Sequence, residues 1–333
     1  MPSQPIRSLL TASALAALLA LLARPLAAQQ DVQYTQFMHN KLAVNPAVAG
    51  SKGVPVFYAL ARQQWFGLEG APASQAVGFH AQLPRRRVGL GAVFANDVIG
   101  FTRSTQADLA YAYHLQVGRR TYLSAGLHAS ARQYALDWSR ARATELGDAS
   151  VPGVGQRSRL MANFGTGFLV YGDRFYAGLS VPRLLRNRLG FDDADVGGAP
   201  NESLAREEVH AYLLAGAKLP LGGGAGGRLS VKPALLVKRV AGAPLDLDLH
   251  ATLMYDDRVG LGATYRAGGS LTRSVGESID ALLTVRATER LRLGLSYDFT
   301  LTRIREHASG SGELYVEYGL APAKGKLTNP RFF

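Results

Sequence analysis

The 333 residues contain no cysteine, only two tryptophans and a single long hydrophobic run, which lies at the N-terminus. A chain without cysteine forms no disulfide, and it lacks the residue that carries the lipid of a bacterial lipoprotein. What the sequence does contain is 37 glycines, 14 tyrosines and 13 phenylalanines. With few long apolar runs, this composition is typical of many short strands rather than of helices.

The N-terminal run has the features of a secretory signal peptide. Arg7 precedes an apolar core at residues 9–22, and small residues follow at positions 26–28. A membrane anchor is the alternative, but the core is short for a transmembrane helix. We therefore predict that residues 1–28 are removed before Gln29 and that the chain is exported to the cell outer membrane.

Strict alternation of apolar and polar residues dominates the rest of the sequence. In residues 245–255 every second residue is apolar, whereas Asp246, Asp248 and His250 lie on the opposite face. A period of two belongs to a strand and not to a helix. The segment is about as long as a tilted membrane strand, roughly 9–11 residues. Tyr255 ends the apolar row, where an interfacial girdle of aromatic residues would need it.

Fourteen segments are strand candidates by this criterion: 54–62, 74–83, 87–96, 102–116, 121–133, 159–171, 174–182, 208–219, 228–240, 245–255, 258–267, 277–287, 290–302 and 312–320. A soluble β-sandwich would also alternate. The connections, however, are short at every second position and mostly longer between, notably at 134–158 and 183–207. This asymmetry and an even strand count are typical of outer-membrane barrels, whose short turns are periplasmic. We predict an all-β transmembrane antiparallel β-barrel of about 14 strands over residues 54–320.

The segments that flank the predicted barrel do not alternate. Residues 29–53 contain turn chemistry at Asn45 and Pro46, and they lie either in the periplasm or in the barrel lumen. We name Asn45 and Pro46 as a candidate lumen segment. Residues 321–333 are predicted to form a periplasmic tail.

Basic residues gather where the periplasmic turns and the tail are predicted. The formal net charge is +12, and removal of Arg7 and Arg24 with the signal peptide leaves +10. These residues either pair with anionic lipid headgroups or form a docking surface for a periplasmic protein. An exported chain rarely meets nucleic acid, so none is expected as a partner. The candidate docking residues are Arg85, Arg86, Arg87, Arg119, Arg120, Lys324 and Lys326.

Charged residues also fall on the polar faces of the strands, which would line the lumen. An open porin uses such charges to tune selectivity, whereas a closed barrel pairs them into a network, and the sequence leaves both possibilities open. None of the seven histidines has metal-ligand spacing, and no nucleophile-elbow motif accompanies the serines. We therefore predict no enzyme activity and no cofactor. The candidate lumen polar network comprises Asp246, Asp248, His250, Arg286, Arg292 and Asp298.

Several motifs resemble those of the PorP/SprF family of Bacteroidota outer-membrane proteins. They are Q-Y-T-Q-F-M at residues 33–38, N-P-A-V-A-G at 45–50, R-Q-Q-W-F-G at 62–67 with G-A-P at 70–72, V-G-L-G at 88–91, L-G-A-T-Y-R at 261–266 and N-P-R-F-F at 329–333. Val48 and Val259 stand where this family usually has aromatic residues. The motifs span nearly the whole mature chain.

The resemblance implies a barrel tied to the type IX secretion system and to gliding motility. Such a protein would belong to the secretion machinery or would help one secreted adhesin to reach or stay on the cell surface. Trp65 and Phe66 lie in the first outward loop, where they would either grip a partner or fold over the barrel mouth. The alternative function that the sequence leaves open is a porin or solute channel.

Overall fold

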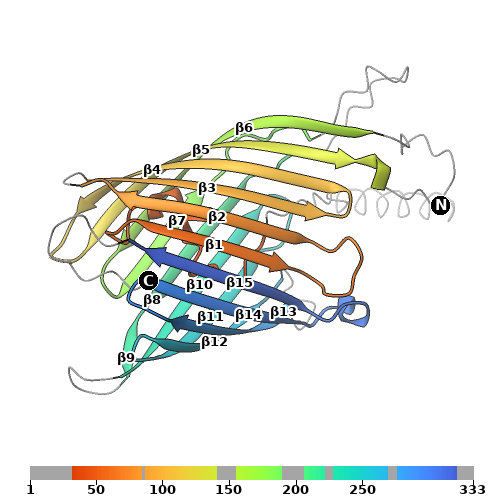
Figure 1. Cartoon of the computed structure of the whole chain (residues 1–333). Coiled ribbons are helices and arrows are strands. Elements are labelled where there is room, and N and C mark those ends of the chain that lie inside the picture. Colours follow the sequence, from red (N-terminus) through yellow and green to blue (C-terminus); the bar gives the residue numbers. More distant parts are fainter. Residues whose placement is uncertain are drawn as a thin grey trace, which may run out of the picture.

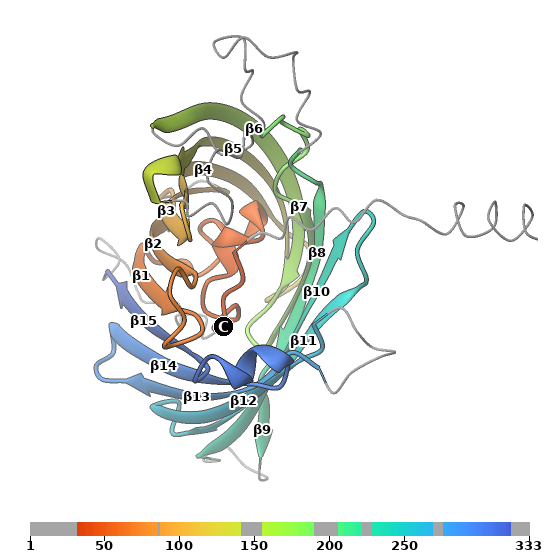
Figure 2. The same cartoon turned by 90° about the vertical axis from the view of Figure 1, so that its right-hand side faces the viewer.

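The computed structural model describes residues 32–84, 87–140, 155–189, 206–221, 228–268 and 276–320. They form a closed antiparallel β-barrel of fourteen strands, in which β8 and β9 are two parts of one strand (Figures 1 and 2). The strands are β1 (Val56–Gln63), β2 (Ala73–Gln82), β3 (Val88–Ile99), β4 (Thr102–Gln116), β5 (Tyr122–Asp137), β6 (Gln156–Tyr171), β7 (Phe175–Val181), β8 (His210–Ala217), β9 (Leu219–Leu221), β10 (Leu229–Val240), β11 (Asp246–Tyr255), β12 (Val259–Arg266), β13 (Ser278–Arg286), β14 (Leu291–Thr300) and β15 (Ser311–Gly319). Pairing of β1 with β15 closes the ring.

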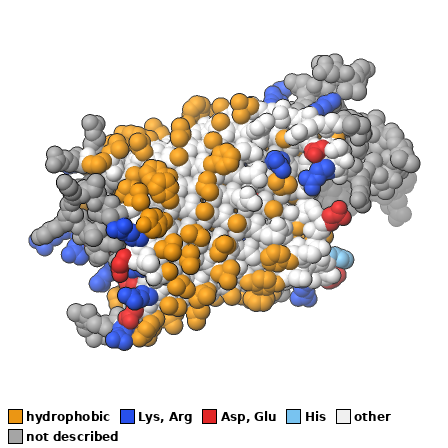
Figure 3. All heavy atoms as spheres, in the orientation of Figure 1, with side chains coloured by type: hydrophobic (Ala, Val, Ile, Leu, Met, Phe, Trp, Pro, Cys, Tyr) orange, Lys and Arg blue, Asp and Glu red, His pale blue; other side chains and the backbone are white. Residues whose placement is uncertain are grey.

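Burial in the strands is the inverse of that in a water-soluble protein. In β11 the buried side chains include Asp248, His250 and Thr252, whereas Leu249 and Leu253 are about half exposed. An apolar outer surface is stable when it faces lipid. Figure 3 shows hydrophobic side chains over most of the outer wall, with charged side chains towards the two ends. The predicted all-β barrel is confirmed. Among the described residues, no helix has the length and apolar character needed to cross a membrane.

The two ends of the barrel differ in their connections, as predicted. The short-turn end carries the connections at residues 83–87, 117–121, 172–174, 256–258 and 287–290. The opposite end, the long-loop end, carries the connections after β1, β5, β7, β12 and β14. The loop expected at 134–158 is shorter and spans 138–155, because β5 and β6 pair with each other as far as Asp137 and Gln156, where the sequence alternation is weak. The connection between β3 and β4 is the short one at the long-loop end and consists of Gly100 and Phe101.

The N-terminal segment lies inside the barrel. We call residues 32–53 the lumen plug; the segment contains two short 3-10 helices, η1 (Lys41–Ala43) and η2 (Pro46–Val48). Figure 2 shows the plug, in orange, within the ring of strands. Its apolar residues Phe37, Ala47 and Val48 are buried against strand residues such as Leu169 and Leu214. The core of this protein is therefore the contact between the plug and the inner wall. Two further 3-10 turns, η3 (Trp138–Arg140) and η4 (Arg303–Glu306), lie in long-loop connections.

Candidate functional site

The lumen plug runs through the barrel from one end to the other. At the long-loop end, Gln33 donates a hydrogen bond to Asp246, the first residue of β11, at 3.2 Å. At the short-turn end, Lys52 pairs with Glu317 at 2.5 Å, two residues before β15 ends. The described part of the plug therefore begins at the long-loop end and ends at the short-turn end, directly before β1.

Asn45 fastens the middle of the plug to the wall. Its side-chain amide donates to the carbonyl oxygens of Phe168 and Leu179, at 3.0 and 3.4 Å. Its side-chain oxygen accepts a hydrogen bond from the Ala47 backbone N–H and so caps η2, while Pro46 occupies the first helical position. Both Asn45 and Pro46, named from the sequence as a candidate lumen segment, are fully buried in the lumen.

Two glycines of the wall make room for the plug backbone. A Cβ atom on Gly89 would lie 1.9 Å from the Ala49 carbonyl oxygen, and one on Gly126 would lie 2.3 Å from the Ala47 nitrogen. At these positions only glycine allows the two backbones to approach so closely. The wall is therefore shaped to hold this segment.

Serine and histidine side chains of the inner wall also bind the plug. The Ser124 hydroxyl donates to the Ala47 carbonyl oxygen at 2.8 Å. The His114 ring lies 2.8 Å from the Ala49 carbonyl oxygen and 2.9 Å from the Tyr171 hydroxyl. Both side chains therefore help to hold the plug against the inner wall.

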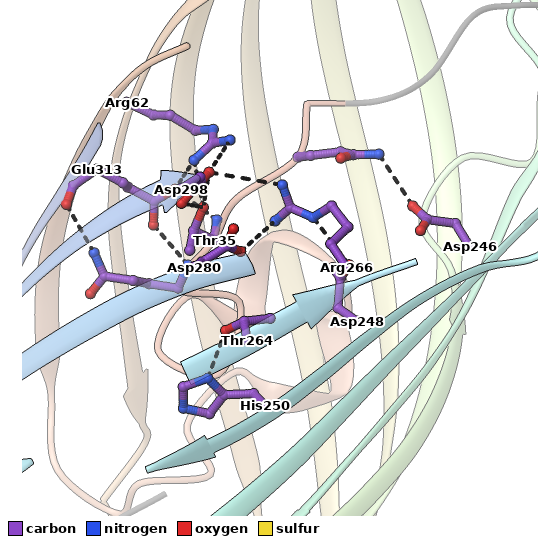
Figure 4. A network of polar contacts seen from close by, with 12 residues as sticks. Thr35, Arg62, Asp246, Asp248, His250, Thr264, Arg266, Asp280, Asp298 and Glu313 are labelled. Atoms are coloured by element: carbon purple, nitrogen blue, oxygen red, sulfur yellow. Dashed lines mark hydrogen bonds and ion pairs between the residues drawn. The ribbon is translucent and has the colours of Figure 1, made fainter. Parts of the chain in front are cut away.

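A cluster of charged side chains surrounds the plug at the long-loop end (Figure 4). We call it the ionic cluster; its members are Arg62, Lys238, Asp246, Asp248, Arg266, Asp280, Asp298 and Glu313. Arg62 pairs with Asp298 at 2.7 Å and also contacts the Thr35 hydroxyl of the plug. Arg266 pairs with Asp248 at 3.1 Å.

The ionic cluster also binds the plug backbone. The two oxygens of the Glu313 carboxylate accept hydrogen bonds from the backbone N–H groups of Thr35 and Gln36, each at 2.8 Å. The Thr35 hydroxyl in turn donates to Asp298. Paired charges with additional hydrogen bonds are the arrangement that a buried ionic group requires. The cluster therefore fixes the first residues of the plug.

The polar network predicted from the sequence is divided between the two ends. Asp246, Asp248 and Asp298 come together in the ionic cluster, and His250 lies beside it, bonded to Thr264 at 2.8 Å. Arg292 instead pairs with Glu317 at 3.2 Å towards the short-turn end, where Arg286 also lies, directly opposite Arg292 in the β13–β14 pairing. Alternation predicts which face of a strand a residue lies on but not its position along the barrel axis, so the prediction combined residues from the two ends into one network. It also missed Arg62, Lys238 and Arg266. Arg266 could have been identified, because it lies on the same strand face as Gly260, Gly262 and Thr264.

The aromatic loop after β1 is fastened to the loop before β15. The Phe66 backbone exchanges hydrogen bonds with Gly310 and Ser309, each at 2.9 Å. The Phe66 ring lies nearly parallel to that of Tyr297, with 6.4 Å between ring centroids. Trp65 has a φ of 49°, a left-handed conformation that is uncommon for a bulky residue. Phe66 keeps 39% of its surface exposed, and Trp65 is half-buried.

The short-turn end carries an exposed ring of arginines, the basic rim. Arg120 pairs with Asp173 of the next turn at 3.2 Å, and 83% of its side chain stays exposed. Arg85, Arg86, Lys324 and Lys326 lie outside the described residues. The described members of the basic rim are Arg87, Arg119, Arg120, Arg174, Arg228, Arg258 and Arg290.

One acidic group at this end is held in its charged form. Asp257, in the β11–β12 turn, contacts Lys218 and lies 3.3 Å from Lys232. Partial burial acts to raise its pKa, but the hydrogen bond from Lys218 and the charge of Lys232 outweigh burial and lower the pKa below its ordinary value.

Comparison of the structure with solved structures finds other outer-membrane barrels at low sequence identity. The Acinetobacter baumannii outer membrane protein Omp33 is 8% identical, with a TM-score of 0.43, and the match covers 80% of this chain and 98% of that one. The CymD monoaromatic hydrocarbon channel is 12% identical, with a TM-score of 0.44, and the match covers 86% and 93%. No curated protein matches the sequence.

The family comparison is decisive. The model of the family described as type IX secretion system membrane protein PorP/SprF matches residues 26–318. This match covers most of the chain and confirms the resemblance seen in the motifs. The barrel and the family together identify an outer-membrane protein, and they point to a non-enzymatic one. The chain belongs to the PorP/SprF family of type IX secretion system membrane proteins.

Proposed function

We propose that the protein is a closed outer-membrane anchor of the type IX secretion and gliding system, which helps a secreted surface protein to reach or stay on the cell surface. The filled lumen carries this proposal. The plug is bound at the long-loop end by the ionic cluster, in the middle by Asn45 and Ser124, and at the short-turn end by Lys52. A barrel filled along its length acts through its outer surfaces and not through its lumen.

Each end of the barrel offers a surface for one side of this task. The basic rim faces the periplasm if the short turns have their usual orientation. Its seven described arginines would attract acidic periplasmic proteins or anionic lipid headgroups. The long-loop end, with the exposed edge of Phe66, then faces the cell exterior, where the secreted protein would be held.

Two measurements test the proposed function. Purification from native outer membranes in mild detergent, with mass spectrometry, should recover either secretion components or one large secreted protein. The purified barrel in planar bilayers should show no steady ion conductance, because the plug fills the lumen. Recovery of the barrel alone together with stable conductance would establish a porin and overturn the proposal.

A further inference from the structure

Strand β6 extends beyond its neighbour on one side. It pairs with β5 along its whole length, from Gln156 opposite Asp137 to Tyr171 opposite Tyr122. Its pairing with β7 begins only at Thr166. Residues 156–165 of β6 therefore have a strand neighbour on the β5 side alone, at the long-loop end of the barrel.

The chain after β7 leaves the wall and does not continue the sheet. The Pro182 carbonyl oxygen bonds the His128 ring, which faces the lumen, at 2.8 Å. The same oxygen lies 2.1 Å from the position that a Cβ on Gly165 would occupy. Because the Cβ position of Gly165 is on the inner side of β6, the chain at Pro182 passes over the inner face of the strand.

Asparagine side chains form hydrogen bonds with the part of this edge that lies next to the β6–β7 pairing. The Asn163 side-chain oxygen accepts hydrogen bonds from the backbone N–H groups of Phe164, Leu184 and Leu185, at 2.9–3.0 Å. Asn187 donates to the Ala162 carbonyl oxygen at 3.1 Å. The Leu184 backbone N–H also donates to the Phe164 carbonyl oxygen, at 2.8 Å. Residues 184–187 and the Asn163 side chain thus take the place of a neighbouring strand as far as the Ala162 carbonyl.

Beyond Ala162, no described residue pairs with this edge. Alternate residues of an antiparallel strand direct their backbone groups to the same side. The Phe164 and Ala162 carbonyls point away from β5, so the N–H and C=O groups of Leu160, Ser158 and Gln156 do so too. Within the described part of the chain these groups have no hydrogen-bond partner. An open strand edge of this kind is a template for pairing with another strand.

We propose that residues 156–160 accept an extended strand of the secreted surface protein by β-strand addition. This inference rests on the proposed function and names where the secreted protein is held. Strand addition supplies main-chain hydrogen bonds, and the alternating side chains supply specificity.

The side chains of the edge define the chemistry of the incoming strand. Leu160 faces outward with 74% of its surface exposed, so the outer face of the added strand should be apolar. Arg157 and Arg159 lie on the inner face, so the inner face of the added strand would meet polar side chains. The fitting partner is an extended segment in which apolar residues alternate with polar ones.

Site-specific photo-crosslinking in native outer membranes tests this inference. A benzoylphenylalanine is placed at Ser158 or Leu160 of the full-length chain, and Leu261, a lipid-facing residue of β12 that is 66% exposed, is the control position. We expect crosslinks from positions 158 and 160 to one exported protein, at sites two residues apart in that protein. No crosslinks, equal crosslinks from position 261, crosslinks without this two-residue step, or crosslinks only within the chain itself would overturn strand addition.

A pair of substitutions separates backbone pairing from side-chain contact. Ser158→Pro removes the N–H that faces the open edge and leaves the β5 side of the ladder intact, because that N–H points away from β5. Ser158→Ala keeps the N–H. We expect crosslinking from position 160 to fall at least about fivefold in the proline variant and to be unchanged in the alanine variant. If both variants crosslink equally, the edge does not pair with a strand, and co-purification of the secreted protein would still report on the proposed function separately.

Discussion

The attachment of the plug to the wall can be tested with two asparagines of the same segment. Asn45 and Asn40 are each 1% exposed, but only Asn45 makes side-chain hydrogen bonds. Neither polar atom of the Asn40 side chain has a partner among the described residues. The substitutions Asn45→Ala and Asn40→Ala therefore remove the same atoms from similarly buried sites and differ in the hydrogen bonds lost.

The magnitude follows from the hydrogen bonds. Asn45→Ala loses the bonds to Phe168 and Ala47, at 3.0 and 2.9 Å, and the weaker one to Leu179. At about 1 kcal/mol for each good hydrogen bond, the wall contacts and the cap of η2 together contribute about 2–3 kcal/mol to the folded, docked plug relative to the opened plug, and the substitution removes this stabilisation. That corresponds to a roughly 30- to 150-fold increase in the undocked population. Asn40→Ala removes an unsatisfied buried amide, so it should change the docking free energy little.

Hydrogen exchange of the purified barrel, measured by mass spectrometry, reads out this difference. The amides of Val48 and Ala49 bond to carbonyls within the plug, so they exchange when the plug opens. We expect their exchange to accelerate by the stated factor in Asn45→Ala and by less than about threefold in Asn40→Ala. Equal acceleration in both variants would refute the reasoning, because packing and not hydrogen bonding would then hold the plug.

Four further substitutions, one of them with a matched control, give distinct expected outcomes. Arg62→Met removes the cation nearest to the buried carboxylates of Asp298 and Glu313, and Asp298 keeps only the longer contact of 4.0 Å with Arg266 among the described residues; the free energy of unfolding should fall by about 3–5 kcal/mol. Asp280→Asn should leave the free energy of unfolding unchanged or raise it, because Asp280 lies opposite Asp298 and its one ion pair among the described residues is 3.9 Å long. The heat-dependent shift in gel mobility compares the stability of the two variants. Gly126→Val should displace the plug and speed hydrogen exchange of the Ala47 amide, whereas Ala125→Val, on the outer face of the same strand, should not. Equal exchange rates in the two variants would contradict the close approach of the Ala47 backbone to Gly126. The lowered pKa of Asp257 means that its stabilisation is fully present above the unfolded pKa of about 3.9 and is lost as the pH falls through the folded value. Asp257→Asn should therefore speed unfolding in urea at pH 7 and have no effect at a pH below the folded pKa of Asp257. An equal effect at both pH values would argue against the ion pairs of Asp257 with Lys218 and Lys232.

The periodic strands were predictable because each one carries its own signal. In β11 the sequence alone assigns Asp248 and His250 to one face and Leu249 and Leu253 to the other, and the structure has the same faces. The loops around β5 and β6 were predicted less well. Strand formation there depends on pairing with neighbours, and the sequence of residues 134–137 and 156–158 gives only a weak signal.

The alternation of polar and apolar residues determined the barrel, because a period of two and a lipid-facing surface are properties of each strand separately. The location of the plug was decided only by the tertiary structure. Residues 32–53 have no periodicity, and their place in the lumen depends on partners far away in the sequence, such as Glu313 for Thr35 and Phe168 for Asn45. Register and depth likewise separated Asp298 from Arg292 and left part of β6 without a second strand neighbour among the described residues. These features arise from contacts between strands, which no single segment encodes.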